Sequence, residues 1–321
     1  MQDFSGRLAV ITGGGTGMGR ELACLLTAQG CHVALCDLSE ENMLQTKMLC
    51  ERDASERTRV SVFVADVSEP TSVRAFREEV ARVHETDHVH LLFNNAGIAG
   101  GGSFVLEDRD VWDKTFAVCW GGVYECTRVF LPMLLAAPEG HVVNTSSVNG
   151  FWASLGPTTS HTAYSSAKFA VKGFTEALIN DFRLNAPHLS ASVVMPGHIG
   201  TSIAINSAAF FGSSPKDLSD DELEEAGSRL RKMGLVSEDA SNEDVRQILQ
   251  GLAEAFRDAA PTTARDAAET ILAGVREKRW RILVGQDAEV LDRLVRADPE
   301  IAYEEAFMDR LRAEVPWMLG S

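Results

Sequence analysis

Two side chains that exchange protons, a phenol and an ammonium, stand four residues apart in Tyr164-Ser165-Ser166-Ala167-Lys168. On a helix this spacing places both side chains on one face, a turn apart. A free phenol has a pKa of about 10, and a neighbouring cation favours its deprotonated form and lowers that pKa toward the working range. Such a pair could serve as a general acid/base centre. On its own it proves little, because Tyr-x-x-x-Lys also occurs by chance on many surface helices, and the sequence around it decides.

A glycine-rich stretch near the N-terminus predicts a loop that binds a dinucleotide. The apolar run 7–12 is typical of a buried strand, and 20–29 has a helical pattern. Between them, Gly13, Gly17 and Gly19 form the spacing GxxxGxG. Glycines in this place let backbone N–H groups approach a pyrophosphate at the positive end of the helix. The alternative is a flexible turn that binds nothing.

An acidic residue, Asp37, follows the second predicted strand, 31–36. There it can accept hydrogen bonds from an adenosine ribose, and it would repel the additional phosphate of NADP. Its surroundings, Thr16 and Leu38, bring no compensating cation. The sequence therefore predicts NAD in preference to NADP, with an ordinary helix cap as the alternative role of Asp37.

Further apolar runs alternate with helical stretches, and this rhythm predicts βαβ crossovers that build a parallel sheet covered on both faces. The predicted strands are 60–65, 89–93, 141–145 and 189–195. Small or polar residues follow each run, at the edge where open α/β sheets bind ligands. These segments are Asp66-Val67, Asn94-Asn95-Ala96-Gly97, Ser146-Ser147-Val148-Asn149-Gly150 and Pro196-Gly197-His198-Ile199-Gly200-Thr201.

The composition is typical of a soluble globular protein: 321 residues, 45% hydrophobic and 24% charged. A formal net charge of −16 argues against a nucleic-acid-binding or anionic-membrane surface. Six cysteines show neither a CxxC pair nor metal-ligand spacing, so we expect no disulfide framework and no metal site. No apolar stretch approaches the about 20 residues that span a bilayer, and the chain opens without a leader. We therefore expect a cytoplasmic protein.

Together these motifs resemble those of the short-chain dehydrogenase/reductase (SDR) family, in the same order and relative positions. The resemblance rests on TGGGTGMG, Asp66, NNAG, the serine before Tyr-x-x-x-Lys and PGHIGT. It covers about residues 4–203, with a looser continuation at 264–285. It implies one Rossmann-type α/β/α domain over 1–321 with seven mainly parallel strands, a substrate lid at 203–263, a helical extension at 286–321, and a homodimer or homotetramer.

The resemblance also implies catalytic roles. Tyr164 would act as the general acid/base, and Lys168 would hold the nicotinamide ribose and lower the pKa of Tyr164. Ser147 would bind the substrate oxygen; its rival Ser146 matches the family pattern less well.

For the cofactor, Asp37 would bind the adenosine ribose, and Asp66 and Val67 would flank the adenine. The other positions would line the pyrophosphate or the nicotinamide end. They are Gly13, Thr16, Gly17, Met18, Gly19, Leu38, Asn94, Ala96, Gly97, Pro196, Gly197, Ile199 and Thr201.

Two features around the catalytic motif depart from the family pattern. Cys119 stands where the family usually carries an asparagine that helps to hold a water in the proton relay beyond Lys168. A thiol is a weak donor and acceptor, so either backbone and water replace the asparagine, or the relay is weakened or redox-sensitive. Ser147 and Tyr164 are also unusually far apart, with the extra length in 156–161. We expect His161 in that loop to be solvent-exposed, with a second catalytic base as the alternative.

The segment after Thr201 is a third departure, because it is long. Its apolar residues Ile203, Ile205, Phe210 and Phe211 could line a substrate pocket under a mobile lid, whereas the acidic run 217–225 has the pattern of a solvated helix face. After a last strand at 280–284, two helices at about 287–297 and 300–313 lead to an apolar tail, 316–319. That tail could pack on a neighbouring subunit or roof the pocket.

The leading hypothesis is an NAD-dependent alcohol dehydrogenase or ketoreductase that acts on a bulky, largely apolar secondary alcohol or ketone. Steroid-, terpenoid- and aryl-alcohol-like molecules fit this description. The alternative is a non-catalytic NAD-binding regulator on the same scaffold, with Cys119 marking an altered proton relay. The intact Ser147, Tyr164 and Lys168 count against the regulator.

Overall fold

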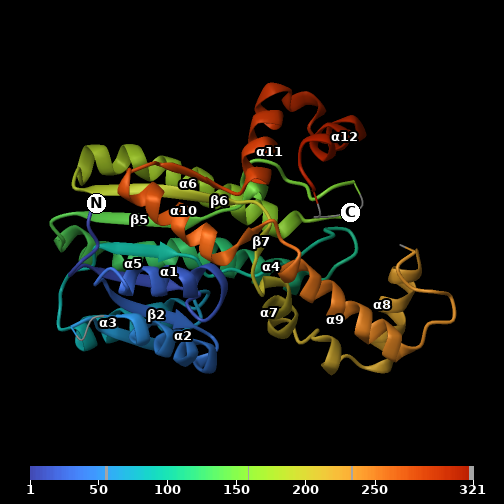
Figure 1. Ribbon diagram of the computed structural model, residues 1–321, viewed down its shortest axis with the longest axis horizontal. Helices are drawn as coiled ribbons and strands as arrows, with labels where there is room; N and C mark the ends of the chain where they lie inside the picture. Colours follow the sequence, from blue (N-terminus) through green and yellow to red (C-terminus); the bar gives the residue numbers. More distant parts are fainter. Residues whose placement is uncertain (55–56, 158, 233, 318–321) are drawn as a thin grey trace.

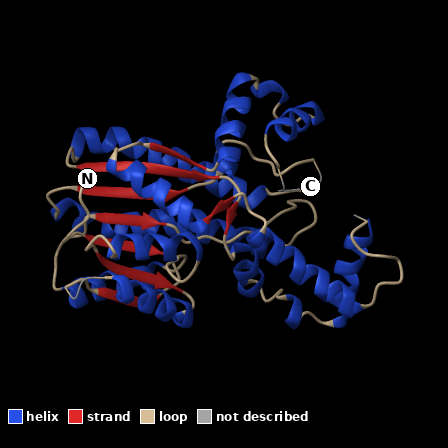
Figure 2. Ribbon diagram, in the orientation of Figure 1, coloured by secondary structure: helices blue, strands red, loops and turns tan. Residues whose placement is uncertain are grey.

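The computed structural model describes residues 1–54, 57–157, 159–232 and 234–317, and its centre is a seven-stranded sheet in the order β3-β2-β1-β4-β5-β6-β9. All neighbouring strands are parallel, so their carboxyl ends meet at one edge (Figure 2). This confirms the predicted Rossmann-type sheet. The strands are β1 (Leu8–Thr12), β2 (His32–Asp37), β3 (Val60–Val64), β4 (Leu91–Asn94), β5 (Gly140–Thr145), β6 (Leu189–Pro196) and β9 (Arg281–Val284).

Strand β1 shows why helices cover both faces of the sheet. All five of its residues are buried, although successive side chains of a strand point to opposite faces. Ala9 and Ile11 belong to the core on one face, and Leu8 and Val10 belong to the core on the other. An uninterrupted apolar strand of this kind needs cover on both sides.

The helices form two layers (Figure 1). One layer packs α1 (Gly17–Thr27), α2 (Glu40–Asp53) and α10 (Ala264–Arg276) on the core that contains Ile11. The other packs α3 (Pro70–His84), α5 (Gly122–Ala136) and α6 (Thr162–Asn185) on the core that contains Val10. Helix α4 (Arg109–Phe116) continues through a π-helical segment (Ala117–Gly121) into α5, and a 3-10 turn (Val148–Gly150) follows β5.

The predicted lid is helical and extends beyond the carboxyl edge of the sheet (Figure 1). Its elements are α7 (Ile203–Phe210), a 3-10 turn (Pro215–Asp217), α8 (Asp220–Lys232) and α9 (Asn242–Asp258). The acidic run supplies the first turn of α8, where negative charge complements the helix dipole. Helices α8 and α9 share a small core of their own, and a short strand pair, β7 (Ile199–Gly200) with β8 (Thr262–Thr263), joins the lid to the sheet edge.

The C-terminal extension packs on its own chain. Helices α11 (Gln286–Ala297) and α12 (Glu305–Glu314), with a 3-10 turn (Pro299–Ile301) between them, form a third core around Trp152. The indole of Trp317 meets that of Trp152 edge to face at 5.6 Å, and its Nε1 donates to the carbonyl of Leu155 at 2.8 Å. The tail therefore braces the loop that follows Ser147. The rest of the predicted apolar tail, Met318 and Leu319, lies outside the described residues.

No helix in the described part of the chain combines the length and the apolar character that a membrane crossing requires.

The packing of Trp317 can be tested by truncation. Because this indole is only 6% exposed, we expect Trp317→Ala to lower the free energy of unfolding by about 3–5 kcal/mol, measured by urea denaturation. Trp280→Ala is the control, since Trp280 is 43% exposed, and it should unfold close to the wild type. Equal midpoints for Trp317→Ala and the wild type would contradict the packing of the tail.

Candidate active site

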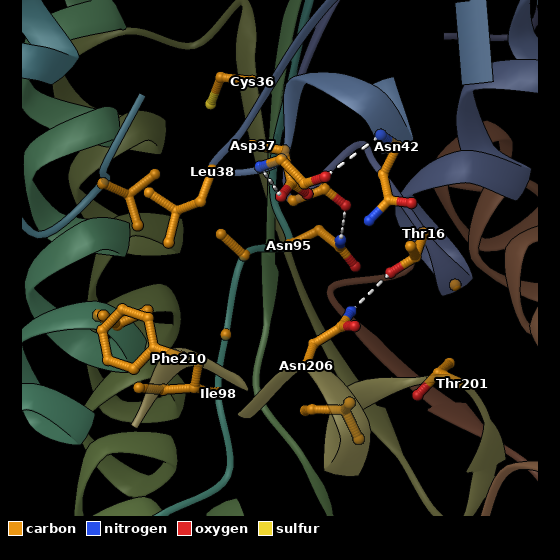
Figure 3. A pocket seen from close by; sticks show the side chains of 18 of the residues that line it. Thr16, Cys36, Asp37, Leu38, Asn42, Asn95, Ile98, Thr201, Asn206 and Phe210 are labelled. Carbon is orange, nitrogen blue, oxygen red and sulfur yellow. Dashed lines mark hydrogen bonds between the residues drawn. The ribbon is translucent and has the colours of Figure 1, made fainter. Parts of the chain in front are cut away.

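A cavity of about 460 Å³ opens at the carboxyl edge of the sheet, between the glycine loop, the end of β2 and helix α7 (Figure 3). Motifs from five separate stretches of sequence meet there, as the strand ends predict. The predicted residues that line it are Gly13, Thr16, Gly17, Met18, Asp37, Leu38, Asp66, Val67, Ala96, Gly97 and Thr201.

The glycine loop requires glycine on steric grounds. Gly13 and Gly17 have φ values of +66° and +54°, a region that side chains disfavour. A Cβ on Gly13 would lie 2.8 Å from the Cα of Ala96, and one on Gly19 would lie 2.1 Å from the carbonyl oxygen of Gly13. Gly19, in the first turn of α1, thus packs directly against the backbone of Gly13, which a side chain would prevent.

The carboxylate of Asp37 holds the loop in place from the end of β2. Its Oδ2 accepts from the Gly15 amide at 2.9 Å, and its Oδ1 accepts from the Ser39 amide at 3.2 Å. The guanidinium of Arg20 donates to the Gly15 carbonyl and to the Thr46 hydroxyl. The anionic end of β2 therefore forms one wall of the cavity, as Figure 3 shows.

The side chains of the two asparagines at the end of β4 point in different directions. Asn94 is 1% exposed, and its side-chain amide donates to Thr127 and Asn144 inside the protein, so it does not line the cavity. Asn95 does line the cavity and donates to the carbonyls of Thr12 and Gly13. Its Oδ1 is buried without a partner among the described residues. The strand pleat explains the difference, because adjacent side chains point to opposite sides.

Most of the predicted PGHIGT positions lie behind the cavity wall as well. Pro196 ends β6, Ile199 is buried in the core, and a Cβ on Gly197 would meet the Asp287 carboxylate at 2.2 Å. Among the described residues of this loop, only Thr201 lines the cavity. The loop instead links elements, since the His198 amide donates to Asp287 and its Nε2 lies 2.7 Å from the Phe256 carbonyl of α9.

Helix α6 is attached to the end of β5 at the turn that carries Tyr164 and Lys168. Lys168 is 2% exposed, and its Nζ donates to the Thr145 carbonyl at 2.9 Å. The Ser146 hydroxyl donates to the Lys168 carbonyl at 2.7 Å. Ser146 is therefore occupied in holding the helix. The ammonium lies 5.3 Å from the centroid of the Tyr164 ring, which agrees with the one-turn spacing.

The electrostatics of Tyr164 differ from the expectation. Burial raises the pKa of Tyr164 well above its ordinary value, the nearby Cys119 raises it further, and a hydrogen bond with Ser147 lowers it in part. Burial also lowers the pKa of Lys168. The predicted lowering of the tyrosine pKa by the lysine charge is thus outweighed by desolvation. Ser147, and not Ser146, is the serine that reaches the phenol.

His161 is not a solvent-exposed loop residue, so that expectation is wrong. Its ring lies 4.6 Å from the Tyr164 ring, centroid to centroid, at the residue before α6. Burial lowers the pKa of His161 to about 4, so the ring is neutral near pH 7. Thr158, in the same loop, lies outside the described residues.

Cys119 occupies the π-helical segment between α4 and α5. Its thiol is fully buried and donates to the Ile98 carbonyl at 3.2 Å. A Cβ on Gly97 would lie 3.6 Å from the Lys168 ammonium and 3.7 Å from the Cys119 sulfur, so both groups flank this glycine. The thiol therefore lies in the immediate surroundings of the Tyr164–Lys168 pair.

Helix α7 closes over the cavity through residues that sequence reasoning missed. Asn206 donates its amide to the Thr16 hydroxyl at 3.0 Å (Figure 3). Of the predicted apolar lid residues, Ile203 and Phe210 line the cavity, whereas Phe211 packs near Gly100. No local motif marks Asn206. Other lining residues without a prior role are Ser39, Asn42, Ile98, Val118 and Ala209.

The sheet, the glycine cradle and the acid that ends β2 define a Rossmann-type dinucleotide-binding protein. Comparison with known proteins then gives the family. The family model described as short chain dehydrogenase matches residues 7–210, and the chain belongs to the SDR family of oxidoreductases.

The relatives agree with this assignment. The protein named as oxidoreductase SadH of Mycobacterium tuberculosis is 32% identical over 296 residues, which cover 92% of each chain. Oxidoreductase UcpA of Escherichia coli is 31% identical over 68% of this chain and 78% of its own. Among solved structures, a Burkholderia phymatum SDR in complex with NAD has a TM-score of 0.72 and 29% identity over 94% of this chain and 96% of its own.

A methyl group at Gly19 tests the glycine cradle. We expect Gly19→Ala to weaken dinucleotide binding at least tenfold, because the new Cβ must displace the Gly13 carbonyl. The measurement is titration calorimetry with NAD and NADP. Gly173→Ala is the matched control: it also lies in a helix, but a Cβ there meets nothing within 4 Å. Unchanged binding by Gly19→Ala would contradict the proposed loop geometry.

Proposed function

We propose that this oxidoreductase transfers hydride between a nicotinamide cofactor, NAD in preference to NADP, and a bulky, largely apolar secondary alcohol or ketone. The observation that carries the proposal is the convergence of Ser147, Tyr164 and Lys168 next to Gly97, which lines the cavity. A single catalytic domain over 1–321, assembled as a homodimer or homotetramer, is part of the proposal. Exposed aromatic residues on α5 and α6, Tyr124 and Phe169, support the assembly.

The residues of the cavity fit a nicotinamide dinucleotide. The cradle at Gly13 and Gly17 admits a pyrophosphate to the start of α1. The Oδ1 of Asn95, which has no partner among the residues that the structure describes, offers an acceptor within the wall. The Asp37 carboxylate at the end of β2 suits the two hydroxyls of an NAD ribose and repels a 2′-phosphate. When bound, the nicotinamide supplies the hydride acceptor or donor.

The chain's own residues handle the proton. During oxidation, the phenolate of Tyr164 accepts the proton of the substrate hydroxyl, and during reduction the phenol returns it. Ser147 holds the substrate oxygen beside the phenol. Lys168, fixed by the Thr145 carbonyl, places a positive charge 5.3 Å from the ring centroid, and this charge favours the phenolate.

The surroundings of the site favour an apolar substrate. Ile98, Val118 and Phe210 line the cavity beside the cofactor positions, and apolar walls gain free energy by covering apolar substrate surface. The rival proposal, a non-catalytic NAD-binding regulator, has the buried Cys119 in its favour. A buried, hydrogen-bonded Lys168 and a Ser147 in contact with Tyr164 favour the enzyme.

Removal of the phenol hydroxyl tests the proton step. We expect Tyr164→Phe to lower kcat/KM by about 10²-fold or more, measured by NADH absorbance with a panel of secondary alcohols, while Tyr124→Phe, which changes an exposed ring, keeps full activity. Because burial raises the pKa of Tyr164, the phenolate fraction grows as pH rises, so alcohol oxidation by the wild type should accelerate from neutral to alkaline pH. Full activity of Tyr164→Phe would exclude the proposed role.

Cofactor choice is tested at the end of β2. We expect Asp37→Ala to lose its preference for NAD, with weaker NAD binding and tighter NADP binding, because the ribose acceptor and the repelling charge are both removed. Dissociation constants from calorimetry measure the change, and Asp53→Ala, at an exposed carboxylate, is the control. A wild type that binds NADP as tightly as NAD would show that Asp37 does not set the preference.

A further inference from the structure

A second cavity, of about 300 Å³, lies at the opposite edge of the sheet, where the strands begin. This edge is on the side of the N label in Figure 1, and it lies apart from the proposed catalytic chemistry. Basic or imidazole side chains make up most of its lining. The lining residues are Gly6, Leu8, His32, Arg57, Arg59, His84, Glu85, Thr86, His88 and His90.

The sheet register brings these groups together from distant parts of the sequence. His32 is the register partner of Leu8, at the starts of β2 and β1. The Val33 amide donates to the Arg59 carbonyl, and the His90 amide donates to the Leu8 carbonyl. Strands that are adjacent in the sheet thus place His32, Arg59 and His90 in one row across its edge.

The backbone fixes how two of the imidazoles are protonated. The Nδ1 of His32 accepts from the Arg59 amide at 3.0 Å, and the Nδ1 of His90 accepts from the Leu8 amide at 3.1 Å. A neutral imidazole that accepts at Nδ1 carries its proton on Nε2. Both rings therefore have an Nε2–H donor even when they are uncharged, which is the polarity that suits an anion.

Burial, with a smaller contribution from nearby arginines, keeps these rings neutral. Burial and the charge of Arg59 lower the pKa of His84 to about 4. Burial, Arg7 and His88 lower the pKa of His90 to about 4. Arg57 lines the same cavity with an exposed side chain. Because imidazoles with such pKa values are neutral near pH 7, the cationic groups of the lining are the guanidinium groups of Arg57 and Arg59.

Of the acidic groups near the cavity, Glu85 offsets part of the charge of Arg59, and the others are paired with His88, Lys278 and the N-terminal ammonium. Glu85 lies 3.6 Å from the guanidinium of Arg59 and is exposed, and Asp87 binds His88 at 2.9 Å from an exposed position. Glu139 acts on His90 in the opposite sense to Arg7, and it is itself paired with Lys278 and the N-terminal ammonium. These carboxylates are therefore already partnered.

No group of three or more His, Cys, Asp or Glu in the described part of the chain is arranged to hold a metal ion. Arginine guanidinium groups and imidazole N–H donors instead match the geometry and charge of a tetrahedral oxyanion. We propose that this cavity is a second ligand site, which binds inorganic phosphate or the phosphoryl end of a small phosphomonoester between the row His32, Arg59, His90 and the neighbouring Arg57.

Histidine NMR on the full-length protein tests this site, because the chain has only eight histidines. Sulfate is the first probe, since it remains a dianion near neutral pH. We expect the His32 and His90 ring signals to shift with saturation at millimolar sulfate. The signals of His188 and His198, which lie outside the cavity, should not move. Inorganic phosphate and phenyl phosphate, compared at one pH, then separate a free ion from a phosphomonoester.

Two variants in the cavity and one control variant outside it keep the test decisive. Arg57→Gln changes an exposed side chain, so it retains the fold, and it should weaken sulfate binding at least fivefold. His90→Gln should do the same, whereas His188→Gln should bind as the wild type does. If chloride at equal ionic strength shifted the His32 and His90 signals as much as sulfate does, the proposal would be overturned. Wild-type sulfate affinity in Arg57→Gln would overturn it as well. Because the readout does not involve turnover, its failure would leave the proposed dehydrogenase activity untouched.

Discussion

The attachment of helix α6 to the carboxyl end of β5 is the constraint on which the candidate site depends. Two hydrogen bonds form it, from the Lys168 ammonium to the Thr145 carbonyl and from the Ser146 hydroxyl to the Lys168 carbonyl. A Cβ on Gly150 would lie 2.2 Å from the Ser146 hydroxyl oxygen, so this attachment requires a glycine at position 150. This attachment engages the Ser146 hydroxyl in a structural hydrogen bond and positions Ser147 beside Tyr164. It also buries the Lys168 ammonium, where its charge is poorly screened.

A buried polar network supports that attachment from within the sheet. The Asn94 amide donates to Asn144 on β5, and the Asn144 amide donates to the Thr175 hydroxyl on α6. Each bond contributes about 1 kcal/mol, but an unsatisfied partner would cost more, so the network fixes the position of α6 against two central strands. On the outside, Trp152 and Trp317 brace the loop between Ser147 and α6. The catalytic turn is thus held from the core and from the C-terminal extension.

The fold and the cofactor cradle were predictable because their signals are local. Apolar runs followed by Gly13, Asp37 or Asp66 mark strand ends, and parallel strands bring all such ends to one edge. The sequence does not reveal that the Asn94 side chain is buried while Asn95 lines the cavity, because the residue at which the pleat turns outward is not visible in NNAG. That Asn94 packs along a cofactor stays a prediction. The burial of His161 against Tyr164 and the closure by Asn206 depend on contacts between segments far apart in sequence. Desolvation of Tyr164 is likewise a tertiary effect that spacing alone does not reveal.

The most direct test of the account is the fate of the carbinol hydrogen. A secondary aryl or terpenoid alcohol, deuterated at the carbon that bears the hydroxyl, would be incubated with the protein and NAD, and the reduced cofactor analysed by mass spectrometry. Transfer of one deuterium to the cofactor, with formation of the ketone, is the predicted result. Absence of labelled cofactor across a broad alcohol panel, from protein shown by calorimetry to be saturated with NAD, would contradict the assignment of Tyr164 and Lys168 as a working proton-transfer pair.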